Sequence, residues 1–225
     1  MNVLQRLIRA DGTRKTRFHT SNGHLCLSPP EFLRALATTV CRVVFQSHSR
    51  SPWLAFSAIN YLEPLISGKR VFEFGSGMST LWFARRCKQV VSVESNPDWY
   101  EVLRQQSSGL ENIQMIHAIS EQDYLGVLSA FGGKFDLIVI DGLYRTQCLS
   151  LARHYLEAEG LLVVDNTDAR PELAAATKRL FADSRIMAFR GWAPGHLHPH
   201  ETTIIRDVPA EAVDSDSLMA RRALG

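Results

Sequence analysis

The sequence has few cysteines and no spacing that would tie them together. Its four cysteines are Cys26, Cys41, Cys87 and Cys148, and no two of them have the two-residue spacing that is typical of zinc sites. Three of them fall in apolar or helical stretches. We therefore expect isolated thiols in a reducing compartment, not a disulfide framework or a zinc site.

Long apolar runs and a strong net charge are also missing. No apolar stretch reaches the roughly 18 residues of a membrane-spanning helix, and Arg6 and Arg9 interrupt the apolar residues near the start, where a signal peptide would lie. The formal net charge is only +2, which gives no electrostatic reason to expect a nucleic-acid or membrane partner. A cytoplasmic location is the default expectation.

What is present is the composition of a globular protein: 45% of the 225 residues are hydrophobic and 21% are charged. This length is at the upper end for one domain. We expect an N-terminal arm over residues 1–28, a single domain over 29–206 and a C-terminal tail over 207–225. Three roles stay open for the arm: a lid, a contact in a homodimer, and a segment without fixed structure.

Two helices are expected before the first strand. Ser28-Pro29-Pro30-Glu31 has the features of a helix start, with proline in the first turn and an acidic residue that suits the helix dipole. Ser51-Pro52 begins a second apolar stretch in the same way, and this stretch ends at Ser67-Gly68.

Short apolar runs and amphipathic stretches alternate from residue 70 onward. The expected strands are Val71–Phe74, Val90–Glu94, Ile113–His117, Leu137–Ile140 and Leu161–Asp165. The expected helices lie near 78–86, 97–107, 121–131, 146–158 and 170–182. Such alternation is typical of a doubly wound α/β fold, in which helices cover both faces of a parallel sheet.

Two more strands are expected at Arg185–Phe189 and Glu201–Arg206. The eleven residues between them contain two prolines and two glycines and show no helical pattern. A parallel crossover needs a dozen or more residues, usually helical. We therefore expect these two strands to form an antiparallel hairpin.

The first strand runs directly into Gly75-Ser76-Gly77, and a helix opens at Ser79. Glycines at such a junction let a ligand approach the backbone, and the helix start offers N–H donors. A dinucleotide fingerprint would have a third glycine where Thr80 stands. Glu73 would repel a pyrophosphate but attract the ammonium of an amino-acid moiety, so the pattern favours a cationic nucleoside.

The second strand ends in an acid, Glu94, 17 residues after Gly77. A carboxylate at the tip of that strand can accept both hydroxyls of a ribose. We therefore expect Glu94 to bind the ribose of the ligand.

These residues, with Asp141 at the end of the fourth strand and the closing hairpin, resemble the class I S-adenosylmethionine-dependent methyltransferases over about residues 52–206. The resemblance implies a mostly parallel seven-stranded sheet of order 3-2-1-4-5-7-6 whose last strand is antiparallel. It implies that Glu73 and the glycine loop hold the methionine end of the cofactor and that Glu94 holds the ribose. The segment from Ala118 to Ser120 would border the adenine, and Ser79 and Asp141 would lie beside the cofactor.

The ends of the fourth and fifth strands also carry Asp141, Asp165 and Asn166, which are hard oxygen ligands suited to Mg²⁺. Their placement resembles the metal-dependent O-methyltransferases of the catechol and caffeoyl-CoA type. There the metal lowers the pKa of the acceptor hydroxyl. The catechol enzymes have a lysine base three residues after the first aspartate; this sequence has Tyr144 there. The alternative is that Asp165 and Asn166 only cap a turn.

A further candidate site is the segment His196-Leu-His198-Pro-His200, which would overhang the ligand edge of the sheet. Its histidines could supply a general base, and the alternatives are a zinc site and a solvated loop. Trp192, just before this segment, could close over an acceptor.

Together these features predict transfer of a methyl group from S-adenosylmethionine to an oxygen of a small molecule or sugar. Asp141 would help to remove the acceptor proton, aided by Tyr144, by His196 or His198, or by a metal. Two alternatives stay open: an NAD(P)-dependent oxidoreductase and a non-catalytic S-adenosylmethionine-binding protein.

Overall fold

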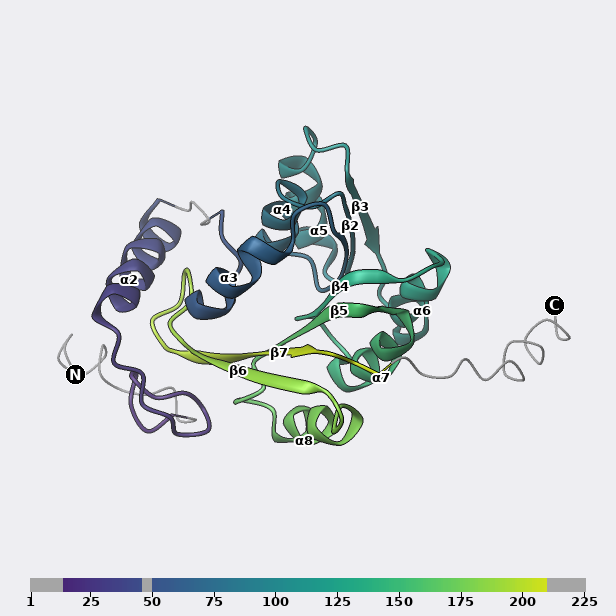
Figure 1. The fold of residues 1–225 in the computed structure, drawn as a ribbon. Helices are drawn as coiled ribbons and strands as arrows, with labels where there is room; N and C mark the ends of the chain where they lie inside the picture. Colours follow the sequence, from purple (N-terminus) through teal and green to yellow (C-terminus); the bar gives the residue numbers. More distant parts are fainter. Residues whose placement is uncertain (1–13, 46–49, 210–225) are drawn as a thin grey trace, which may run out of the picture.

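Seven strands form one sheet with the order β3-β2-β1-β4-β5-β7-β6 (Figure 1). The computed structural model describes residues 14–45 and 50–209. The strands are β1 (Arg70–Phe74), β2 (Gln89–Glu94), β3 (Ile113–His117), β4 (Phe135–Ile140), β5 (Leu156–Asp165), β6 (Arg185–Gly191) and β7 (His200–Arg206). Strand β7 runs antiparallel to both of its neighbours, β5 and β6. The predicted sheet order and the closing hairpin are confirmed.

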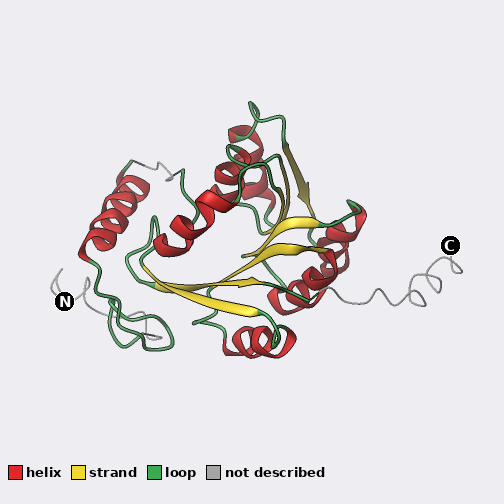
Figure 2. Cartoon of the chain, in the orientation of Figure 1, coloured by secondary structure: helices red, strands yellow, loops and turns green. Residues whose placement is uncertain are grey.

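Helices cover both faces of the sheet (Figure 2). The helices are α2 (Pro29–Val44), α3 (Phe56–Leu62), α4 (Met78–Ala84), α5 (Pro97–Gln106), α6 (Glu121–Ala130), α7 (Arg145–Tyr155) and α8 (Pro171–Leu180), and a short 3-10 helix, η1 (Glu63–Leu65), follows α3. No helix within residues 14–45 and 50–209 has both the length and the apolar character needed to cross a bilayer.

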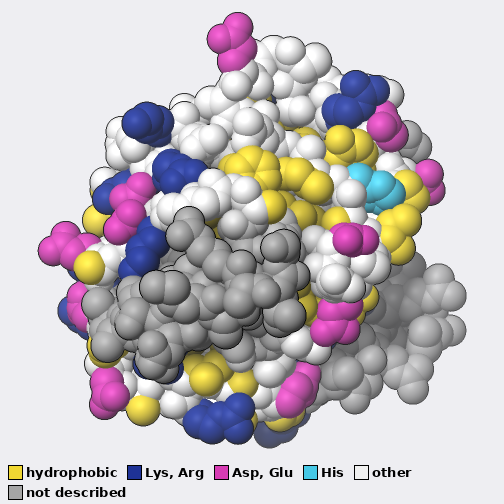
Figure 3. Space-filling view, turned by 90° about the vertical axis from the view of Figure 1, so that its right-hand side faces the viewer, with side chains coloured by type: hydrophobic (Ala, Val, Ile, Leu, Met, Phe, Trp, Pro, Cys, Tyr) yellow, Lys and Arg dark blue, Asp and Glu magenta, His cyan; other side chains and the backbone are white. Residues whose placement is uncertain are grey.

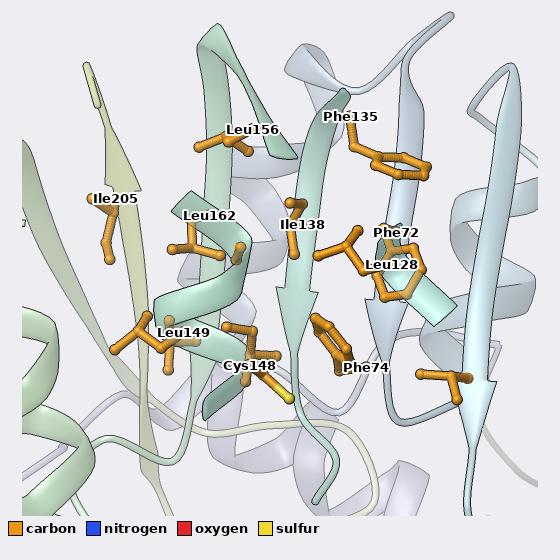
Figure 4. Packing of buried hydrophobic residues seen from close by; sticks show 14 of the residues in the cluster. Phe72, Phe74, Leu128, Phe135, Ile138, Cys148, Leu149, Leu156, Leu162 and Ile205 are labelled. Atoms are coloured by element: carbon orange, nitrogen blue, oxygen red, sulfur yellow. The ribbon is translucent and has the colours of Figure 1, made fainter. Parts of the chain in front are cut away.

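Alternating strand residues build two core layers because successive side chains point to opposite faces. Phe72, Phe74 and Ile138 pack with residues of α6, α7 and α8 on one face, as Figure 4 shows. Val71 and Leu137 pack with residues of α3 and α4 on the other. The continuous apolar runs of the central strands are thus explained by burial on both faces.

The helix that was expected to start at Ser51-Pro52 begins only at Phe56, so this boundary was wrong. Ala55 has extended backbone angles, and its N–H donates to Thr202 Oγ1 in β7 at 3.1 Å. The N–H of Phe56 donates to the carbonyl oxygen of Trp192 at 2.8 Å. Because these tertiary hydrogen bonds hold the chain extended, Trp53 lies before the helix.

The described part of the expected arm, residues 14–28, packs against the domain. His19 and Leu25 form an isolated antiparallel bridge, and the N–H of Ser21 donates to Asp168 Oδ2 at 2.7 Å. The Phe18 ring packs edge-on against Trp192. The remaining arm residues, 1–13, and residues 210–225 of the expected tail lie outside the described residues, and the division into three parts stays a prediction.

The loops after β1 and β4 touch through two glycines. Gly75 has a φ of +94°, and a Cβ on it would lie 2.6 Å from the Cα of Gly142. A Cβ on Gly142 would lie 2.0 Å from the hydroxyl of Tyr124 and 2.8 Å from the amide nitrogen of Gly75. Two backbones can approach this closely only where both residues lack a side chain.

Replacing Gly142 by alanine should therefore destabilise the protein by about 1–3 kcal/mol, because the new methyl group forces the two loops and the Tyr124 ring apart. Urea denaturation followed by circular dichroism measures the change. Gly126→Ala is the control: it lies in α6 with nothing within 4 Å of the new Cβ, so it should stabilise by up to about 1 kcal/mol. Equal effects of the two substitutions would contradict the tight loop contact.

Candidate active site

Glu73 is connected to the glycine loop through hydrogen-bonded hydroxyl groups. Its side chain is completely buried, and its Oε2 accepts hydrogen bonds from the hydroxyls of Thr80 and Ser92. The same Thr80 hydroxyl oxygen accepts the N–H of Gly77 at 2.9 Å, and the Ser92 hydroxyl lies 2.7 Å from that of Ser76. Thr80 thus replaces the third glycine of a dinucleotide loop because its hydroxyl links Glu73 to the turn.

The structure places Glu73 outside the cavity wall, and its expected contact with the ammonium of the cofactor stays a prediction. Glu73 is absent from the cavity wall because strand alternation turns its side chain toward helix α4. Burial raises the pKa of this carboxyl to about 7, although hydrogen bonds from Ser79, Thr80 and Ser92 act in the opposite direction. Glu73 therefore acts on the shape of the loop.

Glu94 joins the glycine loop to the end of β2. Its Oε2 accepts the N–H of Ser76 at 3.0 Å, and its Oε1 accepts the N–H groups of Ser95 and Asn96 at 2.8 and 2.7 Å. A carboxylate has about four acceptor positions, so roughly one position, on Oε2, stays available to a ligand hydroxyl.

A cavity of about 380 Å³ opens above this loop at the carboxyl ends of the strands. Its wall contains these residues that the sequence predicted as cofactor-binding: Gly75, Ser76, Gly77, Ser79, Glu94 and Asp141. Ala118 does not line it; its side chain is buried in the core beneath β2 and β3. The loop after β3 turns Ala118 inward, and its expected place beside the adenine stays a prediction.

Sequence reasoning missed several wall residues. They are Trp53, Met78, Ser95, Trp99, Tyr124, Gly142, Leu143, Arg145 and Arg170. The rings of Trp53 and Trp99 stack with centroids 6.3 Å apart at the cavity. The indole N–H of Trp99 donates to the carbonyl oxygen of Ser76 at 2.9 Å, which fixes it against the loop.

Arg145 lies among the three residues that were expected to bind a metal. Its Nη2 is 2.8 Å from Asp141 Oδ1, and its Nη1 donates to Asn166 Oδ1 at 3.3 Å and to the carbonyl oxygen of Asp165 at 2.5 Å. A guanidinium thus spans the three. Among the described residues, no group of three or more His, Cys, Asp or Glu side chains could hold a metal ion. The expectation of Mg²⁺ gains no support.

Two carboxyl groups with raised pKa values meet beside this arginine. Burial, followed by the charge of Asp165, raises the pKa of Asp141 to about 6, and Arg145 opposes this shift. Burial raises the pKa of Asp165 to about 7, against a hydrogen bond from Thr202 to its Oδ1 at 2.6 Å. The Asp141 side chain is 28% exposed and that of Asp165 only 3%, so a ligand can reach Asp141.

A second cavity, of about 480 Å³, shares Trp53, Asp141 and Arg170 with the first. The rest of its wall consists of Arg14, Asp165, Asn166, Ala169, Glu172, His196, His198 and His200. The histidines of the predicted segment thus do reach a cavity next to the glycine loop.

Two of these histidines, His196 and His200, are held in the neutral form. Burial, with His200 and His198 close by, lowers the pKa of His196 to about 3. Burial also lowers the pKa of His200, whose Nε2 lies 3.5 Å from Asp165 Oδ1. Neutral imidazoles offer both a hydrogen-bond donor and an acceptor to a polar ligand.

Tyr144 and Trp192 do not occupy the places expected for them. Tyr144 has a left-handed backbone at the start of α7, and its ring packs against Tyr124 with centroids 5.7 Å apart. It lines neither cavity, so its expected role in removing the acceptor proton gains no support. Trp192 is buried against Phe18 and Phe32 and cannot close over an acceptor in this position.

Known proteins share this architecture. Residues 72–167 match the sequence profile of a methyltransferase domain. No curated protein matches the chain. A putative O-methyltransferase from Klebsiella pneumoniae is 19% identical with a TM-score of 0.58, over 80% of this chain and 90% of its own. A cofactor-bound protein from MTB is 23% identical with a TM-score of 0.55, over 82% and 92%.

An rRNA methylase from Streptococcus thermophilus is also similar in fold, at 14% identity and a TM-score of 0.51, over 67% of this chain and 93% of its own. At these sequence identities the structural matches show only that the fold is shared. The profile match covers β1 to the turn after β5, which includes the glycine loop, Glu94, Asp141 and Asp165. Residues 72–167 are therefore identified as a methyltransferase domain, and the seven-stranded sheet around them supports membership of the class I S-adenosylmethionine-dependent methyltransferase family.

Proposed function

We propose that this protein transfers a methyl group from S-adenosylmethionine to a hydroxyl oxygen of a small polar molecule or sugar. The observation that carries the proposal is the junction of two cavities at Asp141. One cavity lies over the glycine loop, and the other has a polar wall. A methyl donor in the first and an acceptor in the second would meet beside the one carboxylate that both cavities share with Trp53 and Arg170.

The first cavity suits an adenosyl ligand. Its volume, about 380 Å³, lies in the ordinary range for small-molecule sites. Gly75, Ser76 and Gly77 of the glycine loop line its wall, and the remaining acceptor position of Glu94 fits a ribose hydroxyl. S-adenosylmethionine supplies a methyl group on a sulfonium sulfur, which becomes a thioether when the methyl group leaves.

The second cavity suits a hydroxyl-rich acceptor. Nine of its eleven wall residues are polar or charged, and only Trp53 and Ala169 are apolar. Pockets for drug-like ligands are mostly apolar, so this wall favours a ligand with many hydrogen-bonding groups. Carboxylates, guanidinium groups and neutral imidazoles together offer donors and acceptors to several hydroxyls at once.

In this proposal Asp141 acts as the base. The acceptor oxygen attacks the methyl carbon from the side opposite the sulfur, an O–C bond forms, and the S–C bond breaks with its electrons going to sulfur. The hydroxyl proton passes to a carboxylate oxygen of Asp141. Arg145 holds Asp141 in place by the 2.8 Å ion pair, and the walls of the two cavities supply the alignment that methyl transfer needs.

The surface charge also favours a small acceptor over a nucleic acid. The formal net charge is +2, and on the visible part of the face in Figure 3 basic side chains are interspersed with acidic ones. A phosphate backbone would be matched by a continuous basic stripe. The fold similarity to an rRNA methylase nevertheless makes an RNA probe part of the activity test.

Glu94→Ala should weaken binding of S-adenosylhomocysteine about tenfold or more, because the ribose loses its acceptor and the loop loses three N–H partners. Isothermal titration calorimetry measures this loss, with circular dichroism to check folding. The control is the exposed Glu101→Ala in α5, which should bind as the wild type does. Affinities should be equal in EDTA and in Mg²⁺ because Arg145 already spans the oxygen groups. Unchanged affinity of Glu94→Ala would refute the ribose placement.

Asp141→Asn should lower kcat about 10²- to 10⁴-fold while affinity for S-adenosylhomocysteine changes little, because the amide keeps the contact to Arg145 but cannot take a proton. Release of S-adenosylhomocysteine is followed with methyl glycosides, catechol and a short RNA as acceptors. The exposed Asp183→Asn is the control.

The rate should also depend on pH in a defined direction. Asp141 must be deprotonated to act, and its pKa is raised to about 6, so kcat/KM of the wild type should rise with pH up to about 6 and then level off. Full activity of Asp141→Asn, or methylation of RNA but of neither small acceptor, would refute the proposal.

A further inference from the structure

Helix α2 presents an apolar stripe to solvent. Leu33, Val40 and Val44 are 61%, 43% and 64% exposed, and Ala37 and Cys41 lie between them on the same side. Their spacing of three, four and seven residues places them on one face of the helix. Figure 1 shows α2 at the edge of the molecule, away from the strands, so no other described element packs over this stripe.

The two arginines of the same helix lie close to aromatic rings of their own domain. The Arg34 guanidinium lies 4.2 Å from the centroid of the Phe56 ring, and the Arg42 guanidinium lies 5.9 Å from that of Trp53. Arg34 is nevertheless exposed and lies at the border of the stripe, beside Cys41. In a contact through the stripe it would therefore lie at the rim, while the centre would be free of charges.

The apolar area is too large for an isolated surface feature. The C-cap residue Phe45 is 70% exposed, and Leu25 and Leu27, which precede the helix, are 56% and 71% exposed. Together with the stripe they expose on the order of several hundred Å² of apolar surface, as much as the largest apolar patches of monomeric proteins, which are often functional. A standard interface buries roughly 800 Å² per partner, so an area of this order is enough for its apolar centre.

We propose that this stripe is the contact of a two-fold symmetric homodimer, in which α2 packs antiparallel against α2 of a second copy. A stripe without charges is complementary to itself, and a two-fold axis places the same residues on both sides. Antiparallel packing also opposes the two helix dipoles. A membrane surface would instead require several Lys or Arg beside the apolar face, whereas α2 has one exposed basic residue, Arg34.

The inner face of α2 connects this contact to the histidine segment. The Thr38 hydroxyl oxygen accepts the N–H of Gly195 at 2.9 Å, directly before His196. A partner that supports α2 from outside would therefore support the wall of the second cavity. This link rests on the proposed function, whereas the dimer itself does not.

The first test is sedimentation equilibrium of the full chain over a micromolar concentration range. The wild type should be a dimer and Val40→Glu a folded monomer by circular dichroism. Val102→Glu is the matched control, because Val102 lies on α5 with a similar exposed fraction of 39% and should remain dimeric. A monomeric wild type overturns the proposal, as does a Val40→Glu variant that stays dimeric.

Cross-linking through Cys41 tests the geometry without a change in the stripe. With the axis midway between Leu33 and Val44, the two Cys41 Cα atoms would lie about 12 Å apart. A short bismaleimide should therefore give a covalent dimer of the Cys26→Ser variant, in which Cys41 is the remaining exposed thiol. Dimers in the centrifuge without cross-linking would place the interface elsewhere and overturn the proposal. A monomeric protein in which Cys41 does not react with the reagent would mean that something other than a second copy covers the stripe. This result would overturn the proposal equally. Neither test uses activity, so neither depends on the methyl acceptor.

Discussion

The guanidinium of Arg145 ties together the carboxyl ends of β4 and β5, and the candidate site is arranged around it. Its Nε donates to Gly142, its Nη2 to the backbone and side chain of Asp141, and its Nη1 to Asp165 and Asn166. All five N–H groups thus have acceptors, which is what allows this charge to lie in a mostly buried position. The same charge opposes the effect of burial on the pKa values of Asp141 and Asp165. Without it, two neighbouring carboxyl groups in a poorly solvated place would favour protonation.

A second constraint is the distance between loops. Gly75 and Gly142 bring the turns after β1 and β4 into backbone contact, so that the glycine loop and Asp141 share one cavity. The extended segment before α3 then adds Trp53 from a distant part of the chain, held by the bond from Ala55 to Thr202. The methyl donor and acceptor proposed here would meet among elements that the chain supplies from both of its ends.

Much of the fold could be predicted from residue patterns. Six of the seven strands were found within two residues of their true ends because buried strands appear as short apolar runs. The start of β5 was wrong: the strand begins at Leu156, five residues before the expected Leu161 and inside the stretch expected to be helical. The site was predictable where residue type and strand end coincide, as at Glu94 and Asp141. Site residues were missed where a side chain from one helix or loop contacts a different element of the fold. Arg145 follows Tyr144 in the sequence, and nothing in this position indicates that its guanidinium spans three expected metal ligands.

The sequence by itself determined the order of strands and helices, the glycine turn and the acids at the strand ends, because these depend on local periodicity and backbone freedom. Tertiary structure decided which side chains face the cavities. Strand alternation keeps Glu73 out of the cavity wall, and a left-handed backbone places the Tyr144 ring against Tyr124. A hydrogen bond to β7 keeps the chain before α3 extended, which leaves Trp53 at the junction of the cavities. Orientation of this kind depends on contacts between residues far apart in the chain, and local sequence patterns carry no information about such contacts.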